Sequence, residues 1–115
     1  MTRRMERVSE VIKQEVSKIV SYKLQDPRVG LVTVTKVSLS PDLRMAKIYV
    51  VIHGDESAQE ETLNVLKRAK GYIQSEMAPG LKMRSTPSLS FYLDDTEKKN
   101  SHMLQLIEKA VSEDN

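Results

Sequence analysis

Apolar residues recur at spacings of three and four along the first part of the chain, which predicts an amphipathic helix over about residues 4–23. This helix has to end before the turn sequence DPRVG (residues 26–30), because a residue that precedes proline disfavours helical geometry. The apolar stripe of the helix consists of Val8, Ile12, Val16 and Ile19, with Met5, Val11 and Val20 beside it.

Two strands are predicted after this turn. Residues 31–39 are rich in Val and Thr, and residues 44–52 show the alternation of a strand. The short connection SPDL (residues 40–43) has turn chemistry and predicts an antiparallel hairpin. An exposed edge of this hairpin, at residues 43–52, would suit pairing with a strand of another protein, which makes a protein-interaction module the alternative function.

A long helical segment begins at Ser57 or Ala58 and is expected to end at Ala78-Pro79-Gly80. Gly71 lies in its middle, although a glycine inside a helix costs about 1 kcal/mol relative to alanine. The apolar stripe of this helix consists of Leu63, Leu66, Ala69, Ile73 and Met77.

Three explanations for Gly71 remain open on the sequence alone. The helix could pack too closely on a neighbour for a side chain to fit, it could bend there, or a ligand could approach its backbone. A break would expose backbone N–H groups, which favour anions. Three cations, Lys67, Arg68 and Lys70, stand beside the glycine and raise the weight of the anion explanation.

The rest of the chain predicts one more strand and one more helix. Residues 81–86 form a connector, residues 89–93 alternate as a strand, and DDT (residues 94–96) resembles the cap of a last helix. Residues 112–115 are expected to fray. The order helix, strand, strand, helix, strand, helix indicates a single α+β domain over residues 1–115, with helices on one face of the sheet.

Composition excludes some classes of function. The chain has no cysteine, which excludes disulfides and thiolate metal sites, and no apolar run approaches the roughly 20 residues that span a bilayer. The net charge is only +2, but residues 1–30 carry seven Lys/Arg against four Asp/Glu, whereas residues 94–115 carry three against six. This asymmetry suits a polyanion-binding face as well as an ordinary solvated surface. We expect a soluble, cytoplasmic protein.

Five sequences carry a resemblance to a known family, and together they cover nearly the whole chain from about Arg4 to Asp94. They are ERVSEVI (6–12), DPRVG (26–30), TVTKVSLSPDLRMAKIYV (33–50), AKGYIQSEM (69–77) and LKMRSTPSLSFYLD (81–94). In this combination the chain resembles the ribosome-binding factor A family, whose members are type II KH-like domains.

The resemblance implies a three-stranded mixed sheet and a second helix kinked at Ala69-Lys70-Gly71, in place of the GxxG loop with which ordinary KH domains clamp a nucleic-acid backbone. It also implies a non-catalytic assembly factor that binds the immature small ribosomal subunit. Such a factor would contact ribosomal RNA near the 5′-terminal helix and the decoding region and would support cold adaptation. Gln74 stands where the family often has a cation, and the match after Asp94 is loose.

Ten residues are the expected RNA contacts. The three cations before the kink rank first, because a helix break adds backbone donors to their charge. For each cation a solvated surface position is the alternative, and Arg28 could instead brace its turn against Asp26. The ten are Arg4, Arg7, Arg28, Lys67, Arg68, Ala69, Lys70, Gly71, Lys82 and Arg84.

The four tyrosines and one phenylalanine show no pair spaced like the base-stacking platform of an RRM sheet, so we expect recognition of RNA shape and backbone. Phe91 and Tyr72 are expected in the core. His53 and His102 lack ligand spacing, and the chain has neither a phosphate-binding loop nor a nucleophile elbow. We therefore expect a monomer without catalytic residues, metal or cofactor.

Overall fold

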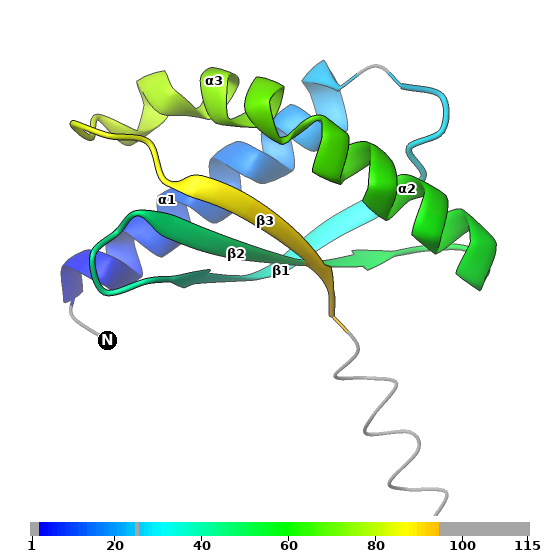
Figure 1. Ribbon diagram of the computed structural model, residues 1–115, viewed down its shortest axis with the longest axis horizontal. Coiled ribbons are helices and arrows are strands. Elements are labelled where there is room, and N and C mark those ends of the chain that lie inside the picture. The colour runs from blue at the N-terminus through cyan, green and yellow to red at the C-terminus, as the bar shows by residue number, and fades with distance from the viewer. Residues whose placement is uncertain (1–2, 25, 95–115) are drawn as a thin grey trace, which may run out of the picture.

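The computed structural model describes residues 3–24 and 26–94. The predicted order of elements is confirmed over this range, whereas the predicted last helix and the frayed end lie outside it. The elements, drawn in Figure 1, are α1 (Arg3–Lys18), a π-helical turn η1 (Ile19–Lys23), β1 (Val32–Leu39), β2 (Met45–Ile52), α2 (Glu56–Arg68), α3 (Lys70–Leu81) and β3 (Ser88–Leu93).

The sheet is mixed, as expected, and its strand order is β1-β2-β3. β1 and β2 form the predicted antiparallel hairpin, and β3 lies parallel to β2 on its other side. The expectation of an exposed edge at residues 43–52 is therefore wrong, because β2 is the central strand and its backbone is paired on both sides. The free edges of the described sheet belong to β1 and β3.

All three described α-helices cover the same face of the sheet (Figure 1). The core forms between this face and the apolar stripes of the helices, so that alternate strand residues such as Ile48 and Phe91 are fully buried. Burying each such side chain contributes about 1.5–3 kcal/mol, and the expected place of Phe91 in the core is confirmed. The helical contributors to this core are Ile12, Val16, Leu66, Ile73 and Met77.

The DPR turn is tied to the middle of α2. The hydroxyl of Thr62, which is 1% exposed, accepts a hydrogen bond from the backbone N–H of Gly30 and donates one to the carbonyl of Arg28, both at 3.2 Å. The side chain of Asp26 accepts hydrogen bonds from the backbone N–H of Arg28 and from its guanidinium. The turn is therefore held in place from both sides.

Both ends of the long helical segment differ from the prediction. α2 begins at Glu56, earlier than expected, because the side chain of Asp55 caps it by accepting from the N–H of Ala58 at 2.8 Å. α3 continues through Pro79 and ends only at Leu81, so the expected stop at residues 78–80 is wrong. Proline removes the hydrogen bond to the carbonyl four residues earlier, which belongs to the exposed Ser75.

Leu81 packs against the core, which favours this last turn of α3. Lys82, and not a glycine, then ends the helix with a left-handed backbone at φ 52°.

Candidate nucleic-acid interface

The long helix breaks at Ala69, between α2 and α3. The backbone of Ala69 has φ −86° and ψ 3°, which leaves helical geometry for one residue. The N–H of Ala69 still donates to the carbonyl of Val65, and its own carbonyl accepts from Ile73, both at 2.9 Å. The axis therefore bends without loss of these two bonds, and Lys70 and Gly71 become the first residues of a new helix.

Gly71 lies on the surface just after this break. A Cβ built on it would meet nothing within 4 Å, so close packing does not explain the glycine. Of the three explanations that the sequence left open, two remain: a bend, which is present two residues earlier, and a backbone left accessible to a ligand.

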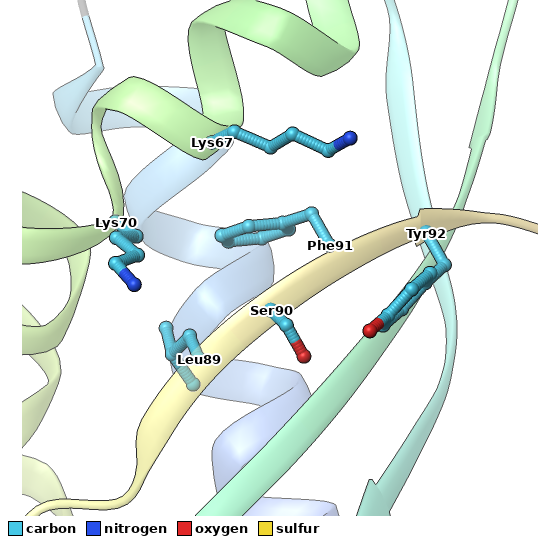
Figure 2. Close-up of a pocket in the computed structure, with 6 residues that line it drawn as sticks. All are labelled: Lys67, Lys70, Leu89, Ser90, Phe91 and Tyr92. Carbon is cyan, nitrogen blue, oxygen red and sulfur yellow. The ribbon is translucent and has the colours of Figure 1, made fainter.

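A cavity of about 310 Å³ lies between the break and β3. Figure 2 shows the side chain of Lys67, from the end of α2, above the Phe91 ring, and that of Lys70, from the start of α3, to the left of it. We call this cavity the groove, and its lining residues are Lys67, Lys70, Leu89, Ser90, Phe91 and Tyr92.

The strand that forms the second wall of the groove is an edge of the sheet. The N–H of Ser88 donates to the carbonyl of Arg44, just before β2, and that of Asp94 donates to Val50 in β2. With a period of two, the backbone groups of Leu89 and Phe91 therefore point to the free edge. The N–H of Leu89 is taken by the side chain of Gln74 at 2.9 Å. The backbone groups of Phe91 thus point to the free edge of β3, and Phe91 also lines the groove.

Arg68 points to a different neighbourhood from Lys67 and Lys70. Its charge acts on Asp26 in the DPR turn, although Arg28 dominates there: the hydrogen bonds from Arg28 lower the pKa of Asp26 from its usual 3.8 to about 2. The guanidinium of Arg28 contacts this carboxylate at 2.8 and 3.0 Å. Arg28 therefore does brace its own turn, as the alternative for this residue predicted.

The remaining predicted contacts lie toward one end of the molecule. Arg4 and Arg7 are exposed near the start of α1, and Lys82 and Arg84 are exposed in the α3–β3 connection. In Figure 1 the start of α1 and this connection lie at the left, whereas the break lies in the middle and the DPR turn at the right. The ten predicted residues therefore extend along the molecule, and only Lys67 and Lys70 line the groove.

Sequence reasoning missed the contribution of β3 to this site. The local pattern around Ser90 and Tyr92 does not show that β3 lies beneath the broken helix. The signal available in the sequence is the helical segment between two strands, because such a crossover is typical of parallel strands. The expectation for Tyr72 is wrong: it is exposed, and its hydroxyl donates to the carbonyl of Lys23 at 3.4 Å.

Among residues 3–24 and 26–94, no helix is long and apolar enough to cross a membrane. Among the same residues, no group of three or more His, Asp or Glu side chains is arranged to hold a metal ion.

A type II KH-like domain with a cationic break in its second helix is the class of protein that this fold and groove define. The family model for ribosome-binding factor A matches residues 4–107. The chain is 38% identical over 113 residues to ribosome-binding factor A of Pseudomonas syringae pv. syringae (strain B728a), an alignment that covers 96% of this chain and 82% of the relative. The chain belongs to the ribosome-binding factor A family.

Solved structures agree with this assignment. The crystal structure of ribosome-binding factor A from Thermus thermophilus superposes with a TM-score of 0.69 at 29% identity, over 77% of this chain and 94% of that one. A homology model of the Thermus thermophilus factor, fitted into an electron cryo-microscopy map of its 30S complex, gives a TM-score of 0.61 at 27% identity, over 83% and 96% of the two chains.

Proposed function

We propose that this protein binds the immature small ribosomal subunit and that the groove at the helix break grips the backbone of ribosomal RNA. One observation carries the proposal: Lys67 and Lys70, which lie before and after a helix break, line a single groove, and Gly71 next to the break leaves the backbone accessible. The Thermus thermophilus relative, which was fitted into a 30S complex, supports the choice of partner.

The groove supplies three kinds of contact to an RNA strand. The two lysines neutralise phosphates, and each neutralised phosphate steepens the salt dependence of binding by about 0.7 in log–log slope on single strands. Gly71 lets a sugar-phosphate backbone approach the start of α3, where helical N–H groups favour anions. The free edge of β3 presents backbone donors and acceptors to the bases.

The finer assignment follows from the family resemblance. The RNA is that of the 5′-terminal helix region near the decoding region. The factor assists late maturation of the subunit and then leaves it. Its role is larger in the cold, when mispaired RNA is slower to escape from its wrong pairing. It acts as a cytoplasmic monomer by binding and not by catalysis. Arg4, Arg7, Arg28, Arg68, Lys82 and Arg84 extend the phosphate contacts beyond the groove.

Charge reversal in the groove tests the proposal. The double variant Lys67→Glu and Lys70→Glu should no longer co-sediment with small ribosomal subunits, while its circular dichroism spectrum stays that of the wild type. A matched control reverses two cations away from the groove, Lys13 on α1 and Arg44 at the hairpin turn, and should co-sediment normally. Unchanged co-sedimentation of the groove variant refutes the site.

A further inference from the structure

The face of the sheet opposite the helices carries an aromatic pair. Tyr49 on β2 and Tyr92 on β3 are register partners, and their ring centroids lie 5.7 Å apart with 31° between the planes. Tyr92 is 44% exposed, and none of the described helices covers this face (Figure 1). The two rings therefore form a surface of two adjacent π-systems on a rigid sheet.

Two lysines complete this surface. Lys36 is the register partner of Tyr49 on the other side, and its Nζ lies 5.8 Å from the centre of the Tyr49 ring. The Nζ of Lys47 lies 6.0 Å from the centre of the Tyr92 ring. We call these four residues, Lys36, Lys47, Tyr49 and Tyr92, the platform.

The simplest alternative is that the platform only stabilises the sheet through cross-strand pairs. Two features argue for a ligand. A contact between a lysine and an exposed ring contributes little free energy, and a base that stacks on the tyrosine contributes more than the lysine contact it displaces. A displaced lysine remains close by, with its charge free for the phosphate of the stacked nucleotide.

The platform is also continuous with the groove. Tyr92 belongs to both, since it lines the groove and its ring lies next to the ring of Tyr49. Figure 2 shows that Phe91 points from β3 toward the helices, whereas Tyr92 points to the other side of the strand. The lining of the groove therefore includes side chains from both faces of β3. A chain that leaves Lys67 and Lys70 can therefore pass over the free edge of β3 and reach Tyr92 and then Tyr49.

We propose that single-stranded RNA continues from the groove over the edge of β3 and stacks two successive bases on Tyr92 and Tyr49, with Lys36 and Lys47 on its phosphates. This inference rests on the proposed RNA-binding function and adds a second surface to it. Asp94 lies two residues beyond Tyr92 and accepts a hydrogen bond from Thr35 at 2.6 Å, so this carboxylate sits at the border of the platform. On β2 the RNA phosphates therefore run toward Lys47, and Lys36, the chain neighbour of Thr35, is the phosphate contact nearest this carboxylate.

Titration of a fluorescein-labelled, single-stranded oligoribonucleotide into the full-length protein tests the platform. Tyr49→Leu, which keeps an apolar side chain but removes the ring, should weaken binding about tenfold, the loss expected for one stacked base. Tyr49→Phe keeps the ring and should bind within about twofold of the wild type. Tyr22→Leu, at a tyrosine that is 81% exposed on η1, is the matched control and should have no effect.

The groove variant Lys67→Glu/Lys70→Glu in the same titration separates the two proposals. If this variant binds RNA weakly and Tyr49→Leu binds like the wild type, the platform is refuted and the groove stands. If the wild type binds no RNA, or if the groove variant binds as well as the wild type, the proposed function fails and the platform with it.

Photocrosslinking of the wild-type protein to the same RNA containing 4-thiouridine gives a readout that does not depend on the folding of a variant. The platform predicts crosslinks within β2 at Tyr49 as well as within β3. Crosslinks that leave Tyr49 unmodified overturn the inference.

Discussion

The side-chain oxygen of Gln74 accepts a hydrogen bond from the backbone N–H of Leu89 at 2.9 Å, and this bond joins α3 to the free edge of β3. The two residues connect the walls of the groove, since Leu89 lines it and Gln74 lies one turn after Lys70. A lysine or arginine at position 74 has no acceptor and could not make this bond. Gln74 therefore acts as a brace between the two walls of the groove.

Removal of this brace should loosen the groove. In Gln74→Met the N–H of Leu89, a residue that is 2% exposed, loses its partner, and we expect the free energy of unfolding to fall by about 1 kcal/mol. RNA affinity should fall as well, because the two walls are no longer held at a fixed spacing. Urea unfolding and RNA titration measure the two effects.

Gln74→Glu is the matched control for the brace. The glutamate keeps an acceptor for Leu89 and should retain wild-type stability, but its charge beside Lys70 should weaken RNA binding. Equal stability of the Met and Glu variants would show that the bond contributes nothing.

Gly71→Ala separates stability from binding at the break. The added Cβ meets no atom within 4 Å, and alanine favours a helix, so the variant should be more stable by up to about 1 kcal/mol. The same methyl group stands where an RNA backbone approaches, so affinity for the small subunit should fall. Thermal unfolding and co-sedimentation measure the two effects.

Ser75→Ala provides the control for this pair of effects, because Ser75 is exposed on the same helix and does not line the groove. It should stabilise slightly and leave binding unchanged. A Gly71→Ala variant that binds small subunits as tightly as the wild type would remove the explanation of the glycine by ligand approach.

Thr62→Val should detach the DPR turn from α2. Valine matches threonine in shape but leaves the N–H of Gly30 and the carbonyl of Arg28 without their shared partner, at a cost of about 1–2 kcal/mol. Thr62→Ser keeps the hydroxyl and should retain more of the stability. The measurement is the urea midpoint at constant slope, and a midpoint for the valine variant equal to that of the serine variant would contradict the role of the hydroxyl.

The pair formed by Asp26 and Arg28 predicts a dependence of stability on pH. The pKa of Asp26 is about 2 in the folded protein and 3.8 in its usual surroundings, so the folded state favours the ionised carboxylate. The contribution of the pair is therefore fully present above about pH 4 and is lost as the pH falls toward 2.

Unfolding of the wild type and of Asp26→Asn between pH 2 and pH 7 measures this contribution. The difference in stability should be constant at neutral pH and should shrink in the acid range. A difference that is independent of pH would mean that the ion pair does not stabilise the fold.

The sequence predicted most of the fold because its signals are local. Spacings of three and four fixed α1, and alternation with a short turn fixed the hairpin. The break at Ala69 followed from the family resemblance together with the position of Gly71. The end of α3 was missed because the packing of Leu81 outweighs the preference of Pro79 for a helix end, and such packing is not visible in a local pattern.

The site was predicted less completely, because its second wall comes from a distant part of the chain. Lys67 and Lys70 were found from their spacing around Gly71. Ser90 and Tyr92 join them only because β3 crosses over to lie parallel to β2. The proximity of Tyr49 and Tyr92 has the same origin, since 42 residues separate them in the sequence and only the register of β2 and β3 pairs them.

Crosslinking of the tagged protein to RNA in living cells, with identification of both the nucleotides and the modified peptides, tests the central claim most directly. The proposed function predicts that small-subunit ribosomal RNA is recovered and that it is attached within residues 67–71 and 88–92. Recovery of no ribosomal RNA, or of ribosomal RNA attached only to segments away from the helix break and β3, would contradict it.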